Sequence, residues 1–259
     1  MIPLSDDNPT LRTPVVTYVL LLAIGATWFF AQGAGLDPQV LAASVCNYGL
    51  VAGELTRMAP VGEAVPLGAG MLCVVDRDPV NLLTPFSSMF LHGGWMHLLG
   101  NGLFLWVFGN NVEDSMGRLR FVAFYLICGL VAAIAQVVVD PSAAVPMVGA
   151  SGAISGVMGA YLLLYPRVRV NMLFIFFIFI RVIPLPAWVV LLWWFGLQVI
   201  SALPGLAGVQ EASGGVAFMA HIGGFVAGVV LVKIFENPDL VGRRVRGPRR
   251  VHNSRLYRR

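Results

Sequence analysis

Residues 141–166 read PSAAVPMVGASGAISGVMGAYLLLYP, a stretch that contains no charged side chain. An α-helix needs about 20 apolar residues to cross the roughly 30 Å hydrocarbon core of a bilayer, so this stretch can hold one crossing. Five further charge-free runs of at least 19 residues lie on either side of it, at Thr13–Leu36, Pro79–Val112, Phe121–Val139, Val182–Gln210 and Ala212–Val232. The sequence therefore predicts an all-α membrane protein with six transmembrane helices.

The composition of the 259-residue chain supports this prediction. Hydrophobic residues make up 58% of the chain and charged residues 12%, and the mean hydropathy is +0.79. Soluble domains carry about 25% charged residues, so a soluble globular enzyme, a disordered chain and a nucleic-acid-binding domain are all disfavoured. The three cysteines lack the CxxC spacing of a zinc site. We expect no metal, no cofactor and no nucleic-acid partner.

The positive charges predict the orientation in the membrane. If both termini are cytoplasmic, all of the 17 Lys and Arg residues except Arg57 and Arg77 fall on the cytoplasmic side, as the positive-inside rule requires. The predicted segments are a cytoplasmic N-terminal segment at 1–12, a six-helix membrane domain at 13–235 with an outer loop at about 35–87, and an Arg-rich cytoplasmic tail at 236–259. We expect this tail to be disordered and held near anionic lipid headgroups by its charge.

Two shorter charge-free runs and the cysteines complete this description. Pro38–Gly53 is interpreted as loop or surface helix, and Val170–Ile180 as an interfacial or re-entrant piece. Cys46 and Cys73 lie in the outer loop, where an oxidising environment would let them pair, although the sequence is equally compatible with two free thiols. Cys128, within the third run, is expected to be a packing residue.

The predicted spans contain no Asp or Glu. An aspartyl intramembrane protease needs two buried carboxylates, a zinc protease needs an HExxH motif with its acid, and a proton-coupled transporter commonly uses an acidic relay. All three classes are therefore disfavoured. Chemistry within this membrane would have to use Ser, His and Asn side chains.

Three even-numbered runs contain such residues near their predicted outer ends. They are LHGGWMHLLGN at 91–101, with His97 and Asn101 on one helix face, GASGAISG at 149–156, with Ser151, and AHIGGFVAG at 220–228, with His221. Each residue alone has an ordinary structural interpretation, since Ser bonds to its own backbone, His packs and Asn joins helices. Their common depth favours one shared site.

Small residues supply a second constraint on these helices. Gly149, Gly152, Gly156 and Gly159 recur at three- and four-residue steps in the fourth run, and Gly224 and Gly228 form a GxxxG motif in the sixth. Such stripes let helix backbones approach closely. If the two stripes face each other, Ser151 and His221 come within hydrogen-bond reach, and the imidazole would activate the hydroxyl as a nucleophile.

Together, His97-x-x-x-Asn101, Gly149-Ala150-Ser151-Gly152 and Ala220-His221-x-x-Gly224-x-x-x-Gly228 resemble the motifs of the rhomboid family of intramembrane serine proteases. The resemblance implies a six-helix rhomboid-like bundle that cleaves transmembrane segments of other membrane proteins near their outer ends. It implies that Ser151 is the nucleophile and His221 the general base, that His97 and Asn101 stabilise the oxyanion, and that His92 supports this pair. It also implies that the fifth span, around Pro186–Ser201, acts as a lateral gate, with Asn171–Ile180 in the preceding loop.

The sequence departs from the family pattern in two places. Many members carry Trp-Arg before the second span, whereas residues 81–85 here read NLLTP. Some members have an aromatic residue four positions after the nucleophile, stacked on the catalytic His. Here that position is Ser155, which predicts looser packing around His221 and makes Ser155 the rival nucleophile.

Two functions other than proteolysis are compatible with the sequence. One is a catalytically inactive rhomboid-like protein that binds membrane clients, although such proteins usually lose the Ser or the His. The other is a channel or transporter, which would need polar residues toward the inner ends of the spans; residues 103–108 read LFLWVF instead. With no organelle-targeting extension before the first run, we expect a bacterial inner-membrane protein whose partners are lipid and single- or multi-span substrates. The substrate and the oligomeric state stay open.

Overall fold

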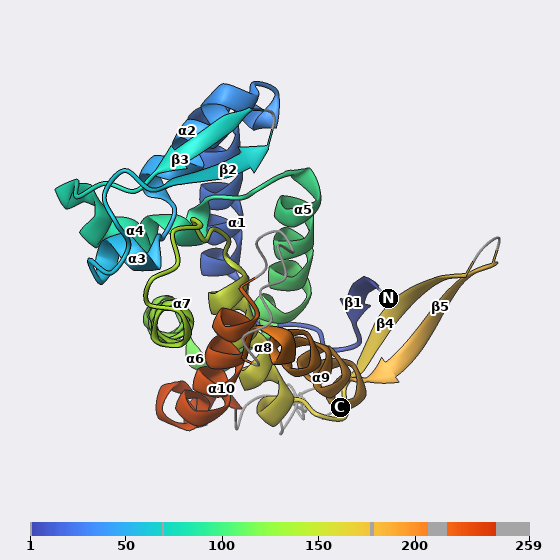
Figure 1. The fold of residues 1–259 in the computed structure, drawn as a ribbon. Coiled ribbons are helices and arrows are strands. Elements are labelled where there is room, and N and C mark those ends of the chain that lie inside the picture. Colours follow the sequence, from blue (N-terminus) through green and yellow to red (C-terminus); the bar gives the residue numbers. More distant parts are fainter. Residues whose placement is uncertain (1, 69, 177–178, 207–216, 242–259) are drawn as a thin grey trace, which may run out of the picture.

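A computed structural model describes residues 2–68, 70–176, 179–206 and 217–241, and they form a mostly helical molecule (Figure 1). Its longer helices are α1 (Val15–Ala26), α2 (Pro38–Tyr48), α5 (Trp95–Phe104), α7 (Arg118–Val139), α8 (Ser151–Leu164), α9 (Ala187–Leu206) and α10 (Phe218–Phe235). Its short helices are α3 (Ala52–Leu55), α4 (Thr84–Ser87) and α6 (Asn110–Met116). Its strands are β1 (Ile2–Asp6), β2 (Ala64–Gly68), β3 (Met71–Val74), β4 (Arg169–Phe176) and β5 (Phe179–Pro186).

Three of the described helices are long and apolar enough to cross a membrane, namely Arg118–Val139, Ala187–Pro204 and Phe218–Phe235. Val15–Ala31 and Ser151–Leu164 are shorter apolar helices. The second predicted span is built from consecutive helical segments, because a π-helical turn at Leu105–Gly109 joins α5 to α6. Each of the six charge-free runs therefore contains a helix.

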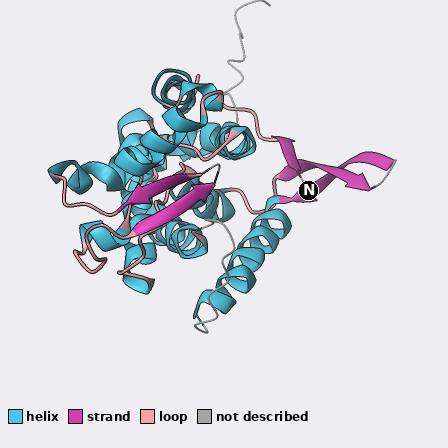
Figure 2. Ribbon diagram, turned by 45° about the horizontal axis from the view of Figure 1, so that its top comes forward, coloured by secondary structure: helices cyan, strands magenta, loops and turns pink. Residues whose placement is uncertain are grey.

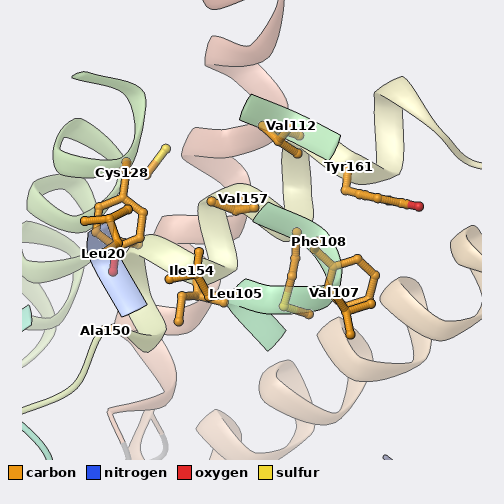
Figure 3. Packing of buried hydrophobic residues seen from close by; sticks show 14 of the residues in the cluster. Leu20, Leu105, Val107, Phe108, Val112, Cys128, Ala150, Ile154, Val157 and Tyr161 are labelled. Atoms are coloured by element: carbon orange, nitrogen blue, oxygen red, sulfur yellow. The ribbon is translucent and has the colours of Figure 1, made fainter. Parts of the chain in front are cut away.

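Helix α8 lies in the core of the molecule, and every residue from Gly152 to Tyr161 is buried. It packs against α7 and α10 and against the π-helical turn after α5. Figure 3 shows Ile154 and Val157 of α8 in the same packed cluster as Leu105 and Phe108. Cys128 of α7 is fully buried, as expected of a packing residue.

The predicted outer loop contains α2, α3, the β2–β3 hairpin and α4 (Figure 1). Pro38–Gly53 is helical over most of its length, which agrees with one of its two interpretations. Cys46 of α2 and Cys73 of β3 form a disulfide, with their Cα atoms 5.4 Å apart. The pairing that the sequence left open is therefore present in the structure.

Strands correct the all-α prediction. β4 and β5 form an antiparallel hairpin, and β1 adds to the β4 edge, so that the three strands have the order β1-β4-β5 (Figure 2). The run Val170–Ile180 was interpreted above as an interfacial or re-entrant piece, but those of its residues that the structure describes lie in β4 and β5. Its β-branched and aromatic residues favour strands, and an 11-residue run is short for a membrane-spanning helix.

The same hairpin shifts the start of the fifth helix. The charge-free run begins at Val182, but α9 begins at Ala187 because residues 182–186 complete β5. Pro184 and Pro186 lie in this segment, and a proline disfavours helical geometry in the residue before it. The Arg-rich tail beyond residue 241 lies outside the described residues.

The N-terminus of α1 is held by carboxylates of α6. Glu113 accepts hydrogen bonds from the backbone amides of Val16 and Thr17, at 3.0 and 2.8 Å, and from the Thr17 hydroxyl at 2.8 Å. Asp114 accepts from the Leu11 amide at 2.8 Å and pairs with Arg12. Because the first amides of a helix lack intrahelical partners, Glu113 supplies acceptors that α1 would otherwise have to find in water, while Asp114 binds the segment that leads into this helix.

Candidate active site

The polar residues selected from three even-numbered runs line one cavity. His97 lies in the first turn of α5, Ser151 is the first residue of α8, and His221 lies in the first turn of α10. Together with Asn101, all three border a cavity of about 1060 Å³. The N-terminal ends of three helices therefore meet at this cavity.

Ser151 and His221 are in direct contact. The Oγ atom of Ser151 lies 2.7 Å from Nε2 of His221. The other ring nitrogen, Nδ1, lies 2.8 Å from Oε1 of Gln198 on α9. Since an amide oxygen only accepts hydrogen bonds, Nδ1 donates to Gln198 and Nε2 is left to accept the hydroxyl proton of Ser151. A neutral imidazole in this tautomer has the arrangement required of a general base.

Ser155 lies in a different environment from Ser151, although it is one turn away on the same helix. Its hydroxyl donates a 2.6 Å hydrogen bond to the backbone carbonyl of Ser151, and the residue is 1% exposed. This is the back-bonded state typical of serine within an apolar helix. The geometry therefore favours Ser151 over Ser155 as the nucleophile.

Gly149 leaves a small space between His97 and Ser151. Its φ of +126° is a conformation that side chains rarely adopt. A Cβ at this position would stand 2.6 Å from Nε2 of His97 and 3.5 Å from Oγ of Ser151. His97 Nδ1 accepts a hydrogen bond from the Gly93 amide at 3.3 Å, so the ring proton is on Nε2. A donor and a nucleophile thus border one space, the arrangement that acyl transfer requires.

Asn101 lies one helical turn after His97 and supplies a second donor on the same helix. The residue is 7% exposed, and its buried Nδ2 has no hydrogen-bond partner among the described residues. A buried amide without an acceptor is costly, so such a group calls for an explanation. A negatively charged oxygen formed in the cavity would supply the acceptor.

His92 contacts His97 and is not among the residues that line the cavity. It is fully buried, and its ring packs edge-on against that of His97 with centroids 5.0 Å apart. Gln32, at the end of the first helical span, binds the His92 backbone twice: its amide donates to the carbonyl at 2.8 Å and accepts from the amide N–H at 2.9 Å. These contacts fix the loop that leads into α5.

The glycine stripes of α8 and α10 face each other. A Cβ at Gly224 would overlap the carbonyl oxygen of Gly152, and a Cβ at Gly228 would overlap that of Gly156. Helix backbones can approach this closely only where side chains are absent. The packing brings the first turn of α10 against α8, which is the position that His221 needs to contact Ser151.

Sequence reasoning missed Gln198, Trp194 and Gln32. Gln198 is the only amide side chain between Val182 and Leu206, and this isolation in an apolar helix was the signal that could have identified it. Trp194 lies one turn earlier, with its ring 5.8 Å from that of His221 and tilted by 41°. The aromatic neighbour of His221 is thus on α9 and not on α8, where residue 155 is a serine. The looser packing around His221 stays a prediction.

Comparisons with known proteins identify relatives of this chain. A family model described as the Rhomboid domain matches residues 80–237. RHOMBOID-like protein 5 of Arabidopsis thaliana is 38% identical over 164 residues, which cover 60% of this chain and 53% of that protein. Rhomboid protease GluP of Bacillus subtilis is 46% identical over 81 residues, which cover 31% of this chain and 15% of that protein. Rhomboid protein 1, mitochondrial, of Saccharomyces cerevisiae is 30% identical over 164 residues, which cover 61% of this chain and 43% of that protein. The alignments thus span about half or less of these relatives.

Proposed function

The chain belongs to the rhomboid family and is an integral membrane protein with several helical spans, and on this premise we propose that it is an intramembrane serine endopeptidase. Relatives named as rhomboid proteases support this class of activity. The observation that carries the proposal is the 2.7 Å contact between Ser151 Oγ and His221 Nε2 at the wall of a cavity. A lone packing serine has no need of such a partner.

The proposed reaction has two steps. Ser151 Oγ attacks the carbonyl carbon of the substrate peptide bond as His221 Nε2 takes the hydroxyl proton. The C–N bond then breaks, His221 gives this proton to the leaving amine, and an acyl ester remains on Ser151. Water attacks the ester, His221 takes a proton from the water and returns it to Ser151, and the new carboxyl terminus leaves.

The oxyanion of each tetrahedral intermediate would occupy the space beside Gly149. Nε2 of His97 and Nδ2 of Asn101 are the proposed side-chain donors, and the backbone amide of Ser151 adds a donor at the start of α8. Negative charge at the first turn of a helix is further stabilised by the aligned peptide dipoles. One donor of this kind is typically worth about 100- to 1000-fold in rate.

The proposed topology has six spans with both termini in the cytoplasm of a bacterial cell. The segments are those given above, with residues 1–12 and 236–259 inside and the disulfide-bonded loop outside. The charge asymmetry supports this orientation, and the Cys46–Cys73 disulfide supports an oxidising outer side. The cavity then lies toward the outer ends of the spans, where water can reach it. We expect the substrates to be transmembrane segments of other proteins, cut near their outer ends.

A cleavage assay tests the proposed activity. The protein, purified in detergent and reconstituted in liposomes, is given a single-span substrate with small, helix-breaking residues near its outer membrane end. Wild type and Ser155→Ala should cleave it, whereas Ser151→Ala and His221→Ala should not. A fluorophosphonate, which reacts with activated serines, should label wild type and spare Ser151→Ala.

The variants separate the ways in which the proposal could fail. If Ser151→Ala cleaved and Ser155→Ala did not, the nucleophile would be wrong. If wild type took up no fluorophosphonate and cleaved none of a panel of such substrates, the chain would be an inactive rhomboid-like protein. Labelling of Ser151 without cleavage would point to a substrate of different sequence and would leave the class of enzyme standing.

A further inference from the structure

His221 is held by two side chains of one helix. Gln198 and Trp194 are four residues apart on α9 and therefore share a face. Gln198 Oε1 accepts from the Nδ1 edge of the imidazole at 2.8 Å, and the ring of Trp194 lies 5.8 Å from the centre of the imidazole. The Nδ1 edge of the His221 imidazole, which faces away from Ser151, is thus bound by α9, and the imidazole ring also lies next to an aromatic ring of the same helix.

Gln198 occupies the place that a carboxylate holds in a three-member catalytic set. Such a third group keeps the histidine in the tautomer whose far nitrogen can accept the nucleophile's proton, and holds the ring at the right angle. The predicted fifth and sixth spans contain no Asp or Glu. A neutral amide oxygen can perform the tautomer and orientation roles without placing a charge in the membrane interior, where charge is costly.

We propose that Gln198 is a positioning residue for His221, holding the imidazole in the Nδ1-protonated tautomer with Nε2 directed at Ser151. The inference rests on the proposed function, since it assigns a group that orients the proposed base. Because Gln198 lies on α9 and His221 on α10, the orientation of the base depends on how these two helices lie against each other. Trp194 restricts the tilt of the same ring.

Substitutions at residue 198 separate this role from simple packing. Gln198→Met keeps an unbranched side chain of similar length but loses the strong acceptor. Gln198→Glu keeps an oxygen at the same position. Leu197→Met is the matched control, since it places the same side chain on the neighbouring residue, which is 43% exposed. All four proteins are compared by thermal unfolding so that a folding defect is recognised.

The rate of labelling by a small fluorophosphonate measures the reactivity of Ser151 without a substrate helix. We expect Gln198→Met to be labelled about tenfold more slowly, the effect of one lost hydrogen bond, and Gln198→Glu to recover most of that rate. Leu197→Met should match wild type. The 15N NMR signals of labelled histidine should show His221 protonated at Nδ1 in wild type and mixed between the two nitrogens in Gln198→Met, with His221→Ala identifying the resonances.

The outcomes distinguish this inference from the proposed function. Ser151-dependent labelling of wild type together with an unchanged rate in Gln198→Met would overturn the role of Gln198 and leave the protease assignment intact. Equal losses in Gln198→Met and Gln198→Glu, with unaltered histidine signals, would reduce Gln198 to a packing residue. If Ser151 of wild type took up no label, the proposed function itself would fail, whereas the histidine spectrum would still report whether Gln198 sets the tautomer.

Discussion

The carbonyl oxygen of Gly152 occupies the space that a side chain on Gly224 would need. The two residues belong to α8 and α10, and one turn farther along Gly156 and Gly228 have the same relationship. Backbone contacts the backbone here, so no flexible side chain can move aside to make room. The distance between Ser151 and His221, each within one turn of this contact, therefore depends on the absence of two Cβ atoms.

Gly224→Ala and Gly228→Ala are expected to lower both stability and activity. Overpacking in a rigid core typically costs about 1–3 kcal/mol, and separating α10 from α8 would lengthen the Ser151–His221 contact. The measurements are the unfolding temperature in detergent and the rate of fluorophosphonate labelling. Gly25→Ala is the control: a Cβ there meets nothing within 4 Å, and alanine favours a helix over glycine. A stable, active Gly224→Leu protein would contradict the packing argument.

Asn101→Ala should reduce turnover without destabilising the protein. The buried Nδ2 has no hydrogen-bond partner among the described residues. Removing it therefore breaks no hydrogen bond that Nδ2 makes with that part of the chain. If Nδ2 binds the oxyanion, kcat should fall by about 100- to 1000-fold, while KM changes little. Initial cleavage rates over a range of substrate concentrations, with thermal unfolding alongside, provide the test. Turnover at the wild-type rate would remove Asn101 from the set of oxyanion donors.

Some features of this molecule could be predicted from sequence because each depends on local chemistry. Charge-free runs indicate spans because charge is costly in lipid. Glycines at helical spacing indicate close backbone contacts, so the pairing of Ser151 with His221 could be predicted from the sequence. Gln198 could not be placed, because the rotation of α9 about its axis is set by packing against α10. The β4–β5 hairpin was missed because an apolar run of 11 residues is ambiguous between strand and helix.

Glu113→Ala should destabilise the protein while leaving the chemistry of the folded fraction unchanged. This carboxylate accepts hydrogen bonds from two backbone amides and from the Thr17 hydroxyl at the start of α1. Hydrogen bonds to charged groups contribute about 1.5–3 kcal/mol each. We expect a loss of about 3 kcal/mol or more from the free energy of unfolding. Glu113→Gln keeps one acceptor oxygen and should lose less.

The readouts for Glu113 are urea or heat unfolding and the labelling rate of Ser151 per folded molecule. Glu113 lies at the far end of the α5–α6 helical segment from His97, so the labelling rate should stay near that of wild type. Thr17→Val, which removes one of the three donors, should have a smaller effect on unfolding. Equal stability of Glu113→Ala and wild type would show that water replaces the carboxylate at no cost.

Reduction of the Cys46–Cys73 disulfide should loosen the outer loop and weaken substrate binding. The two cysteines are 27 positions apart in the sequence. A disulfide that closes a loop of this length stabilises a folded chain by roughly 3 kcal/mol. Cys73 pairs in register with Val65 of β2, and the next residues on that strand, Pro66 and Leu67, line the cavity beside Ser151. A reductant, or Cys46→Ser with Cys73→Ser, should therefore lower the unfolding temperature and raise KM more than it lowers kcat.

Cys128 is fully buried and should resist maleimide in the folded protein under both conditions, which serves as the internal control. If the reduced and oxidised proteins had the same unfolding temperature and KM, the hairpin would be held by its other contacts and the disulfide would have no part in shaping the cavity.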